Sequence, residues 1–438
     1  MPAFGKKMRG KAVGQYCTYI STIHKAAGCK NEIMNIAVAQ SGGPTCVINA
    51  SLAGVFRAGV KSQKIGKIYG SFNGIEGIIS DNLTDLSEHL SSDESIELLL
   101  RTPSAALGSC RRKLPDFEKD PEIYKVITDC FIRHDIGIFL YIGGNDSMDT
   151  VAKLSRYYKE NSIEIKVVGV PKTIDNDLCG TDHCPGFGSA AKYVAATVQE
   201  ITRDSNVYSV PSVTIVETMG RHAGWLTAAA GCMRLNGESA PHLIYLPEHV
   251  FCGEKFISDV KEMMKKHKAV ICAVSEGVRT AEGKFAAEDY QSCKTDAFGH
   301  AYLSGIGKYL ENLVSERIGC KVRSIELNVM QRCSSHFASL TDIEEAQAIG
   351  SAAVEAAVSG ETGVMMGFKR ISDAPYKYEI VSVPASEAAN SERFFPSEWI
   401  TPEGNDVTND ALEYLMPLIQ GELPPVMKNG MPQHFQFR

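Results

Sequence analysis

Two stretches decide the fold of this chain, Gly143-Gly144-Asn145-Asp146-Ser147 and Pro171-Lys172-Thr173-Ile174-Asp175-Asn176-Asp177. Each follows an apolar run typical of a buried parallel strand, 136–142 for the first and 165–170 for the second. Residues 148–161 carry apolar side chains at helical spacing, which predicts a βαβ crossover. Both polar loops are therefore expected at one edge of a parallel sheet, where open α/β sheets bind ligands.

The residue types in these loops indicate phosphoryl transfer. Glycines let a phosphate approach the backbone, and a helix that begins near Ser147 points its N–H groups at an anion. Asp146, Asp175 and Asp177 can hold a cation or accept a proton. Each loop alone also has an ordinary structural explanation, a helix cap for the first and a polar turn for the second.

The composition limits the class of protein. The chain has 438 residues, 44% of them hydrophobic, which is enough for a large core and predicts two domains. A net charge of −7 argues against nucleic acid or an anionic membrane as partner. No apolar run reaches the roughly 18 residues of a spanning helix. The 13 cysteines show no metal-ligand spacing and indicate reduced thiols, so we expect a cytoplasmic protein.

Residues 1–33 differ from the rest of the chain. They are basic and contain no acidic residue before Glu32, as in organelle transit peptides. However, Ser21 is their single serine, arginine is scarce, and Met34 directly precedes the first expected strand. We therefore expect a basic, disordered N-terminal extension, and a targeting peptide is the less favoured alternative.

Further glycine-rich loops follow other predicted strands. Ser41-Gly42-Gly43-Pro44 lies between a strand over 35–40 and a helix over 45–60, which is the arrangement of a phosphate cradle. Polar loops also follow the strands expected over 213–217 and 269–274. A second α/β unit is therefore expected to begin near residue 187, with the substrate cleft between the two units.

Other segments are expected from periodicity and charge. Strands are predicted over 65–70, 243–246 and 364–368, and helices over 190–201 and 341–358, the last with a capping box at Thr341 and Glu344. Leu107 to Lys113 carries three cations, which suit a highly charged phosphate donor but are more often only solvated. Lys321 to Arg332 alternates like a strand and carries two arginines able to clamp a phosphate monoester.

The sequence resembles the phosphofructokinase family over roughly residues 34–400. Seven blocks carry the resemblance, in this order: Ser41-Gly-Gly43, Leu107-Gly-Ser-Cys-Arg111, 143–147, 171–177, Met219-Gly-Arg221, Ser275-Glu-Gly277 and Gln331-Arg332. The resemblance implies an α/β fold of two Rossmann-like three-layer α/β/α domains with the active site in the cleft between them. It also implies Mg²⁺-dependent transfer of a phosphoryl group to the 1-hydroxyl of fructose 6-phosphate.

The resemblance implies a division of the chain and an assembly. Residues 34–186 with about 331–390 are expected to form the phosphoryl-donor domain. Residues 187–330 with about 391–438 are expected to form the sugar-phosphate domain. Arg323 is of the type that reaches across from a neighbouring subunit, which implies a homo-oligomer, a dimer or tetramer, with shared active sites.

The resemblance also implies roles for individual residues. Asp175 is the expected general base for the sugar hydroxyl, with Thr173 beside the transferring phosphoryl group and Asp177 supporting the base and the metal. Arg221 is the fourth catalytic residue, and the expected metal ligands are Asp146 and Asp177. The donor-binding set is Gly42, Gly43, Arg111, Gly144, Asn145, Asp146, Ser147 and Lys172. The substrate-binding set is Thr173, Asp175, Met219, Gly220, Arg221, Glu276, Arg323 and Arg332.

Two positions decide the phosphoryl donor. In this resemblance, family members that use ATP have glycine where this chain has Asp146 and Lys172, and members that use inorganic pyrophosphate have these same residues. A carboxylate at Asp146 repels and sterically excludes the α-phosphate of a nucleotide, whereas Lys172 adds a cation for a compact, highly charged pyrophosphate. Pyrophosphate is the expected donor, and ATP is the alternative.

Because of three departures from the family pattern, the sequence does not decide which sugar phosphate is the acceptor. Asn145 replaces an aspartate, Ser212 a second subunit-crossing arginine, and Val329 a histidine or tyrosine near the 6-phosphate. A larger ketose phosphate such as sedoheptulose 7-phosphate is therefore an alternative acceptor. A dinucleotide-binding oxidoreductase is disfavoured because no G-x-G-x-x-G with a following acid occurs. An inactive regulatory paralogue is disfavoured because the catalytic residues are present.

Overall fold

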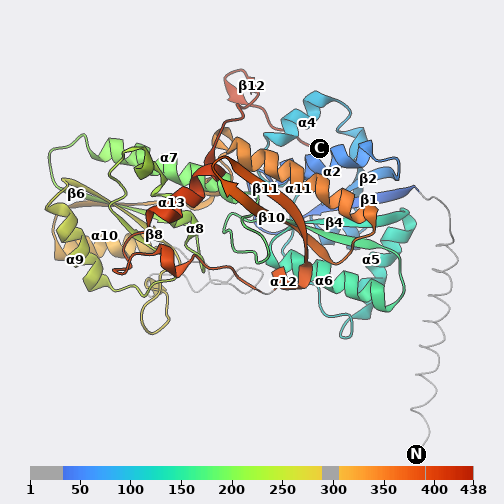
Figure 1. Ribbon diagram of the computed structural model, residues 1–438, viewed down its shortest axis with the longest axis horizontal. Helices are drawn as coiled ribbons and strands as arrows, with labels where there is room; N and C mark the ends of the chain where they lie inside the picture. Colours follow the sequence, from blue (N-terminus) through green and yellow to red (C-terminus); the bar gives the residue numbers. More distant parts are fainter. Residues whose placement is uncertain (1–32, 289–304, 390, 438) are drawn as a thin grey trace, which may run out of the picture.

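A computed structural model describes residues 33–288, 305–389 and 391–437 (Figure 1). Almost all of the predicted extension, residues 1–33, lies outside the described residues. Every cysteine within the described ranges is a free thiol, in agreement with the prediction of reduced thiols. In the same ranges, no helix has both the length and the apolar composition that crossing a bilayer requires.

The larger sheet contains seven strands in the described part of the chain. In spatial order they are β11 (Tyr376–Pro384), β10 (Val364–Asp373), β5 (Lys166–Pro171), β4 (Ile136–Gly143), β1 (Met34–Gln40), β2 (Ile65–Ser71) and β3 (Leu83–Asp85). The strands from β10 to β2 are parallel, and the outer strands β11 and β3 pair antiparallel. The five strands predicted for this part of the chain are confirmed, and β3 and β11 were not predicted.

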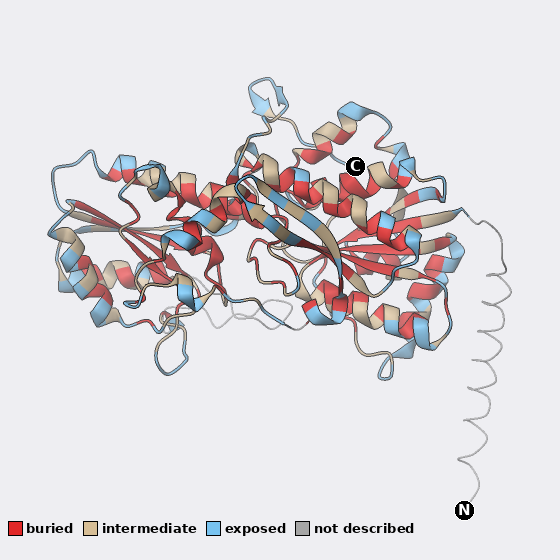
Figure 2. Cartoon of the chain, in the orientation of Figure 1, coloured by how far each residue is buried: buried red, intermediate tan, exposed pale blue. Residues whose placement is uncertain are grey.

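Helices cover both faces of this sheet because its strand residues alternate between two apolar clusters. Ile36 and Val38 belong to one cluster, and Ala37 and Ala39 belong to the other. The first face is covered by α2 (Ile48–Lys61) and α11 (Leu340–Ser359), and the second by α3 (Ile75–Ile79), α5 (Pro121–Arg133) and α6 (Asn145–Glu160). Figure 2 shows the buried residues gathered in the strands and on the inward sides of these helices.

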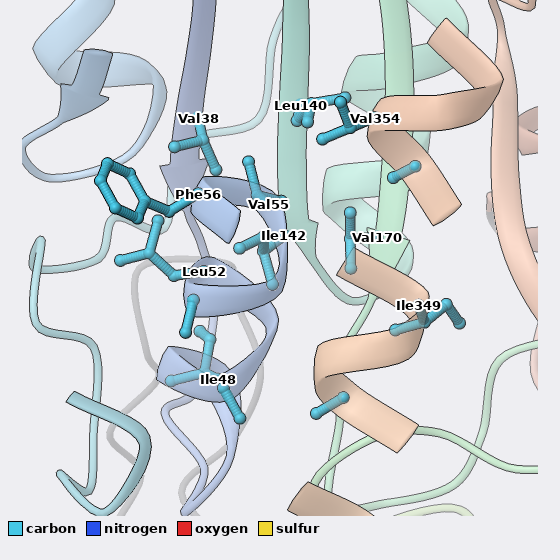
Figure 3. Packing of buried hydrophobic residues seen from close by; sticks show 14 of the residues in the cluster. Val38, Ile48, Leu52, Val55, Phe56, Leu140, Ile142, Val170, Ile349 and Val354 are labelled. Carbon is cyan, nitrogen blue, oxygen red and sulfur yellow. The ribbon is translucent and has the colours of Figure 1, made fainter. Parts of the chain in front are cut away.

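Helices α2 and α11 pack closely on the first face (Figure 3). A Cβ atom on Gly54 would lie 2.1 Å from the Gln347 carbonyl oxygen, and a Cβ atom on Gly350 would lie 2.2 Å from the Ser51 carbonyl oxygen. Glycine is therefore required at both positions for this helix separation. The close packing holds the helix that follows the loop 41–44 firmly against the sheet.

The smaller sheet contains four parallel strands within the described residues. In spatial order they are β7 (Leu243–Tyr245), β8 (Ala269–Ser275), β6 (Ser212–Thr218) and β9 (Lys321–Glu326). One face packs against α7 (Phe187–Ser205), α8 (Trp225–Ala229) and α13 (Asn409–Leu415), and the other against α9 (Gly253–Met264) and α10 (Ile306–Arg317). The predicted fold class, α/β with parallel sheets between helix layers, is confirmed.

The remaining elements are short. They are α4 (Asp93–Leu100), α12 (Ala385–Ala388), β12 (Met427–Lys428), β13 (Met431–Pro432) and the 3-10 helices η1 (Leu86–Glu88), η2 (Cys232–Asn236), η4 (Asn328–Arg332), η5 (Ser335–Phe337), η6 (Ser397–Trp399) and η7 (Met416–Ile419). The C-terminal segment contacts both units, since Leu415 packs in a cluster of the smaller unit and Phe437 in one of the larger. The domain boundaries given above stay a prediction.

Two local predictions were wrong. The strand expected over 321–332 ends at Glu326, and η4 follows it because Asn328 adopts a left-handed conformation with φ +45°. The predicted capping box of α11 is also misplaced. Ser339 caps this helix by accepting a hydrogen bond from the Asp342 backbone N–H at 3.5 Å, and the helix starts at Leu340.

Candidate functional site

The two central loops meet as predicted. Gly143 at the end of β4 pairs with Pro171 at the end of β5, and the Lys172 backbone N–H donates to the Gly143 carbonyl oxygen at 3.0 Å. The loops open on a cavity of about 620 Å³. All eight positions predicted to bind the donor line it, as do Thr173, Asp175, Asp177 and Arg221. On the sugar side it is lined by Met219, Glu276 and Arg332.

The loop after β1 forms one wall of the cavity. Gly42 has a φ of +75°, which favours glycine, and its N–H donates to the Cys110 carbonyl oxygen at 3.2 Å. The Ser109 hydroxyl donates to the Gly42 carbonyl oxygen at 2.7 Å. A Cβ atom on Gly42 would lie 3.3 Å from Lys172 Nζ, so the missing side chain leaves space beside this cation.

Lys172 is a buried cation inside the site. Its residue is 2% exposed, and Nζ donates to the Gly43 carbonyl oxygen at 2.6 Å. Burial lowers the pKa of Lys172 to about 8, against the opposing effect of the Asp175 charge, and the neighbouring cations Arg111 and Arg332 lower it further. Burial removes the ammonium group from bulk water, so an anionic ligand beside it would stabilise its charge.

The carboxylates after β5 lie in the same low-dielectric region. Burial raises the pKa of Asp175, while Arg221, Lys172 and Arg332 act in the opposite direction. The pKa of Asp177 is raised by burial and by the charge of Asp175. The Asp175 backbone N–H donates to Thr173 Oγ1 at 3.0 Å, which fixes the turn that carries both groups. Two neighbouring carboxylates repel each other when both are ionised, so positive charge nearby is needed to keep both in the ionised form.

Asn145 borders this carboxylate pair. Its Nδ2 donates to Asp177 Oδ2 at 3.3 Å. Its Oδ1 is buried and has no hydrogen-bond partner among the described residues. An unsatisfied buried acceptor beside a carboxylate is a position where a cation or water would be stabilised.

The loop after β6 forms the opposite wall. The Met219 backbone N–H donates to Gln331 Oε1 at 3.1 Å, and the Gly220 N–H donates to Glu276 Oε1 at 3.3 Å. Burial raises the pKa of Glu276 to about 8. Gly220, a predicted sugar contact, does not itself line the cavity, although the residues on both sides of it do.

Arg332 and Arg323 lie in different places. The η4 turn brings Arg332 into the cavity. Arg323 lies on β9, outside the cavity, where its Nη1 is 3.3 Å from Asp204 Oδ2. Of the two arginines predicted to bind the sugar phosphate, Arg332 therefore lies with the rest of the site in the same chain, and Arg323 does not.

Several lining residues were missed by the sequence analysis. His222 Nδ1 lies 2.8 Å from a carboxylate oxygen of Glu392, and both side chains line the cavity. The Arg393 backbone N–H donates to the Asp177 carbonyl oxygen at 2.8 Å, so the segment that contains Glu392 runs beside the loop 171–177. Lys113 also lines the cavity. Lys113 belonged to a recognised cluster of cations, whereas nothing in the sequence pairs Glu392 with His222.

Comparison with known proteins identifies the family. The model of the family described as Phosphofructokinase matches residues 35–357. The pyrophosphate–fructose 6-phosphate 1-phosphotransferase of Xanthomonas campestris pv. campestris (strain B100) is 42% identical over 407 residues, covering 92% of this chain and 96% of the relative. The protein of the same name from Methylococcus capsulatus is 41% identical over 403 residues, covering 91% and 95%.

A solved structure agrees with these relatives. The crystal structure of a pyrophosphate-dependent phosphofructokinase from Nitrosospira multiformis is 40% identical to this chain, with a TM-score of 0.81. The match covers 91% of this chain and 95% of the solved one. Sequence and fold thus agree over nearly the full described length, and the chain belongs to the phosphofructokinase family.

Proposed function

We propose that this chain transfers a phosphoryl group from pyrophosphate to the 1-hydroxyl of fructose 6-phosphate. The products are fructose 1,6-bisphosphate and phosphate, in a reversible step of glycolysis. The observation that carries the proposal is that Asp146, Lys172 and Asp175 line one cavity. The names of relatives that are 41–42% identical support it.

Asp175 is the general base in this proposal. It takes the proton of the 1-hydroxyl as the oxygen attacks the phosphorus atom, and the phosphorus–oxygen bond to the leaving phosphate breaks. Burial raises the pKa of Asp175, which makes it a stronger base, while Arg221, Lys172 and Arg332 offset part of this effect and favour the ionised form. Arg221 and Lys172 line the same cavity and stabilise the negative charge of the transferring group.

The residues present fit a divalent cation beside Asp177. The Asp177 carboxylate and the unsatisfied Asn145 Oδ1 supply neighbouring oxygen atoms, which Mg²⁺ prefers as ligands. Asp146 remains the other predicted ligand, but Lys113 Nζ lies 3.0 Å from its Oδ1 and competes with a cation for it. A Mg²⁺ ion held there would neutralise part of the charge on the pyrophosphate oxygens.

Pyrophosphate fits the donor side better than ATP does. Asp146 lies at the start of α6 and lines the cavity, with its side chain 31% exposed. By the resemblance to the family, this is the position that would face the α-phosphate of a nucleotide. A carboxylate there repels a third phosphate group. The buried Lys172 favours a compact donor that reaches deep into the site. ATP-dependent transfer is the alternative function.

The sugar side requires a second subunit in this proposal. Glu276, Met219 and Arg332 are assigned to the sugar phosphate of the same chain. Arg323 lies on the outer strand β9 and outside its own cavity. The nearby exposed residues Val207, Tyr208 and Val210 offer apolar contact area for another copy. We assign a cytosolic homo-oligomer in which Arg323 completes the site of its neighbour.

A coupled assay tests the proposed function. The purified full chain is given fructose 6-phosphate and Mg²⁺, and turnover is measured in parallel with pyrophosphate and with ATP. We expect turnover with pyrophosphate and poor turnover with ATP. Strong activity with ATP and none with pyrophosphate would contradict the proposal. A parallel reaction with sedoheptulose 7-phosphate tests whether the site accepts a larger sugar.

A further inference from the structure

Helix α6 carries a charged stripe that runs away from the donor end of the cavity. Asp146, Asp149, Lys153 and Arg156 follow one another at spacings of three, four and three residues, which places them on one side of the helix. The stripe is acidic at the helix start and basic further along, as the helix dipole favours. Its first member, Asp146, lines the cavity.

The segment from Lys113 to Phe117 docks along this stripe in register. Lys113 Nζ lies 3.0 Å from Asp146 Oδ1. Lys153 Nζ donates to the Leu114 carbonyl oxygen at 2.8 Å. One turn further along the helix, Arg156 Nη2 donates to Asp116 Oδ2 at 2.6 Å, and the guanidinium of Arg156 lies 4.7 Å from the Phe117 ring centroid. The pair of Lys113 and Asp146 is thus the first contact of an ordered series.

The same segment is anchored on both sides of Lys113. Leu114 is buried in the apolar cluster beneath α6. Upstream, Ser109 and Cys110 bond to the backbone of Gly42 in the donor loop. The side chain of Lys113 is 54% exposed, yet its backbone is held between these two attachments. The ammonium group is therefore directed at Asp146 by the fold rather than by the ion pair alone.

We propose that Lys113 is a positioning residue for donor choice, acting through Asp146. The inference rests on the proposed function. Asp146 lies in the first turn of α6 with a partly exposed side chain, and a free aspartate there would exchange between rotamers. The ion pair with Lys113 holds the carboxylate where it opposes a nucleotide's α-phosphate. Lys113 also offsets part of the repulsion between Asp146 and pyrophosphate.

A positioning role and a purely electrostatic role for Lys113 predict opposite changes in donor preference when its ammonium group is removed. If Lys113 acts only as a positive charge, Lys113→Met weakens both anionic donors, and it weakens ATP at least as much as pyrophosphate. If Lys113 holds Asp146 in place, the released carboxylate swings away part of the time and ATP gains relative to pyrophosphate. The ratio of kcat/KM for pyrophosphate to kcat/KM for ATP therefore separates the two explanations.

The experiment measures this ratio in the full chain with Mg²⁺ and fructose 6-phosphate. For Lys113→Met we expect a fall of about two- to fivefold, the range that an exposed ion pair supplies. Lys113→Arg should keep the wild-type ratio because it preserves the ion pair. Lys119→Ala removes an exposed lysine two residues beyond this segment and should leave the ratio unchanged. Thermal unfolding of each variant checks that it is folded.

A second comparison tests whether Lys113 acts through Asp146. In an Asp146→Gly background there is no carboxylate to hold, so Lys113→Met should no longer lower the ratio. Calorimetric titration with pyrophosphate and with ATP gives the same comparison if a variant turns over too slowly. An unchanged or increased ratio in Lys113→Met, or an equal fall in the Asp146→Gly background, overturns the inference. Absence of pyrophosphate turnover in the wild type would instead overturn the proposed function.

Discussion

Lys172 places a titratable charge at the point where the donor is expected to bind. Because burial lowers its pKa to about 8 from the ordinary 10.5, its ammonium is present below that pH and is lost above it. The kcat/KM for pyrophosphate reports groups of the free enzyme. We therefore expect kcat/KM for pyrophosphate to fall as the pH rises through about 8.

The substitution Lys172→Arg provides the control for this pH dependence. A guanidinium does not lose its proton in this range, so the fall should disappear in the variant even if its activity is lower throughout. Ionisation of pyrophosphate itself affects both proteins equally. A decline of the same shape in wild type and variant would assign the titration to another group.

Asp175 is the residue for which the account makes its simplest kinetic prediction. In Asp175→Ser, kcat should fall by about 10²–10⁴-fold, because the general base acts in the transition state. The KM for the sugar phosphate should change little. Steady-state kinetics with both substrates varied provides the measurement. Activity within a few-fold of the wild type would mean that another group accepts the proton.

At the residue scale, much of the site could be predicted because family motifs lie on loops. Most of the motif residues from Gly42 to Glu276 follow predicted strands, and parallel strands bring their carboxyl ends together. Arg111 is the exception, because the segment that carries it follows α4 and not a strand. Glu392 could not be predicted, because its contact with His222 joins positions 170 residues apart without any local pattern. Nor does the sequence show that Lys113 rather than Arg112 would face Asp146.

At the scale of elements, the segment between β5 and α7 is tied to two distant parts of the larger unit. His183 Nε2 lies 2.7 Å from Glu345 Oε2 of α11, and its Nδ1 lies 2.8 Å from Asp182 Oδ2. The imidazole ring stacks on Phe368 of β10 with ring centroids 4.7 Å apart. These contacts fix the segment that follows the loop 171–177. The geometry of this segment therefore depends on the protonation state of His183.

The charge of His183 should make the stability of the fold depend on pH. Burial alone lowers its pKa, but Glu345 and Asp182 outweigh this effect and raise the pKa to about 9 from the ordinary 6.5. A folded-state pKa above the unfolded one gives stability that is complete below pH 6.5 and is lost as the pH rises through about 9. The contribution is at most about 3 kcal/mol.

Urea unfolding at several pH values tests this dependence. The difference in unfolding free energy between the wild type and His183→Gln should shrink as the pH rises from about 6 to about 10. Taking the difference cancels the contributions of the other groups, because these groups titrate in both proteins. A difference that is constant over this range would show that His183 is neutral in the folded protein.

Elements with strong local patterns were predictable and the others were not. The strands with apolar runs agree with their predicted bounds to within one or two residues, except β10, which extends to Asp373 instead of ending at Phe368. The η4 turn escaped prediction because residues 321–332 keep an alternating pattern while Asn328 breaks the strand. Strand β11 alternates apolar and polar residues from Tyr376 to Ile380, which is the pattern of a half-buried strand, but it lacks the apolar run by which the other strands were predicted.

At the scale of the whole molecule, the position of Arg323 outside its own cavity leads to a prediction about assembly. Asp175→Ser and Arg323→Ala should each be poorly active alone. In a mixture of the two, the Asp175→Ser chain supplies Arg323 to a neighbour that retains Asp175, so hybrid oligomers regain complete sites. Activity is measured before and after subunits are exchanged under mild denaturation.

This complementation needs a matched control. A mixture of Asp175→Ser with Asp175→Ala contains no chain with the base, so exchange should restore nothing. Recovery in the first mixture alone supports shared sites. If exchange is demonstrated and the first mixture also stays inactive, Arg323 does not complete the site of a neighbouring chain.

The central claim is that Asp146 and Lys172 together make pyrophosphate the donor. Asp146→Gly alone should raise kcat/KM for ATP no more than a few-fold, since Lys172 still obstructs the nucleotide's path. In Asp146→Gly/Lys172→Gly, both the obstruction and the pyrophosphate-specific cation are lost, and the two effects should be non-additive because the residues act on one phosphate group.

The decisive measurement is the ratio of kcat/KM for pyrophosphate to kcat/KM for ATP in that double variant and in the wild type. We predict that the ratio falls in the double variant, because kcat/KM decreases for pyrophosphate and increases for ATP. A ratio equal to the wild-type value would show that neither residue sets the donor, which would contradict the account.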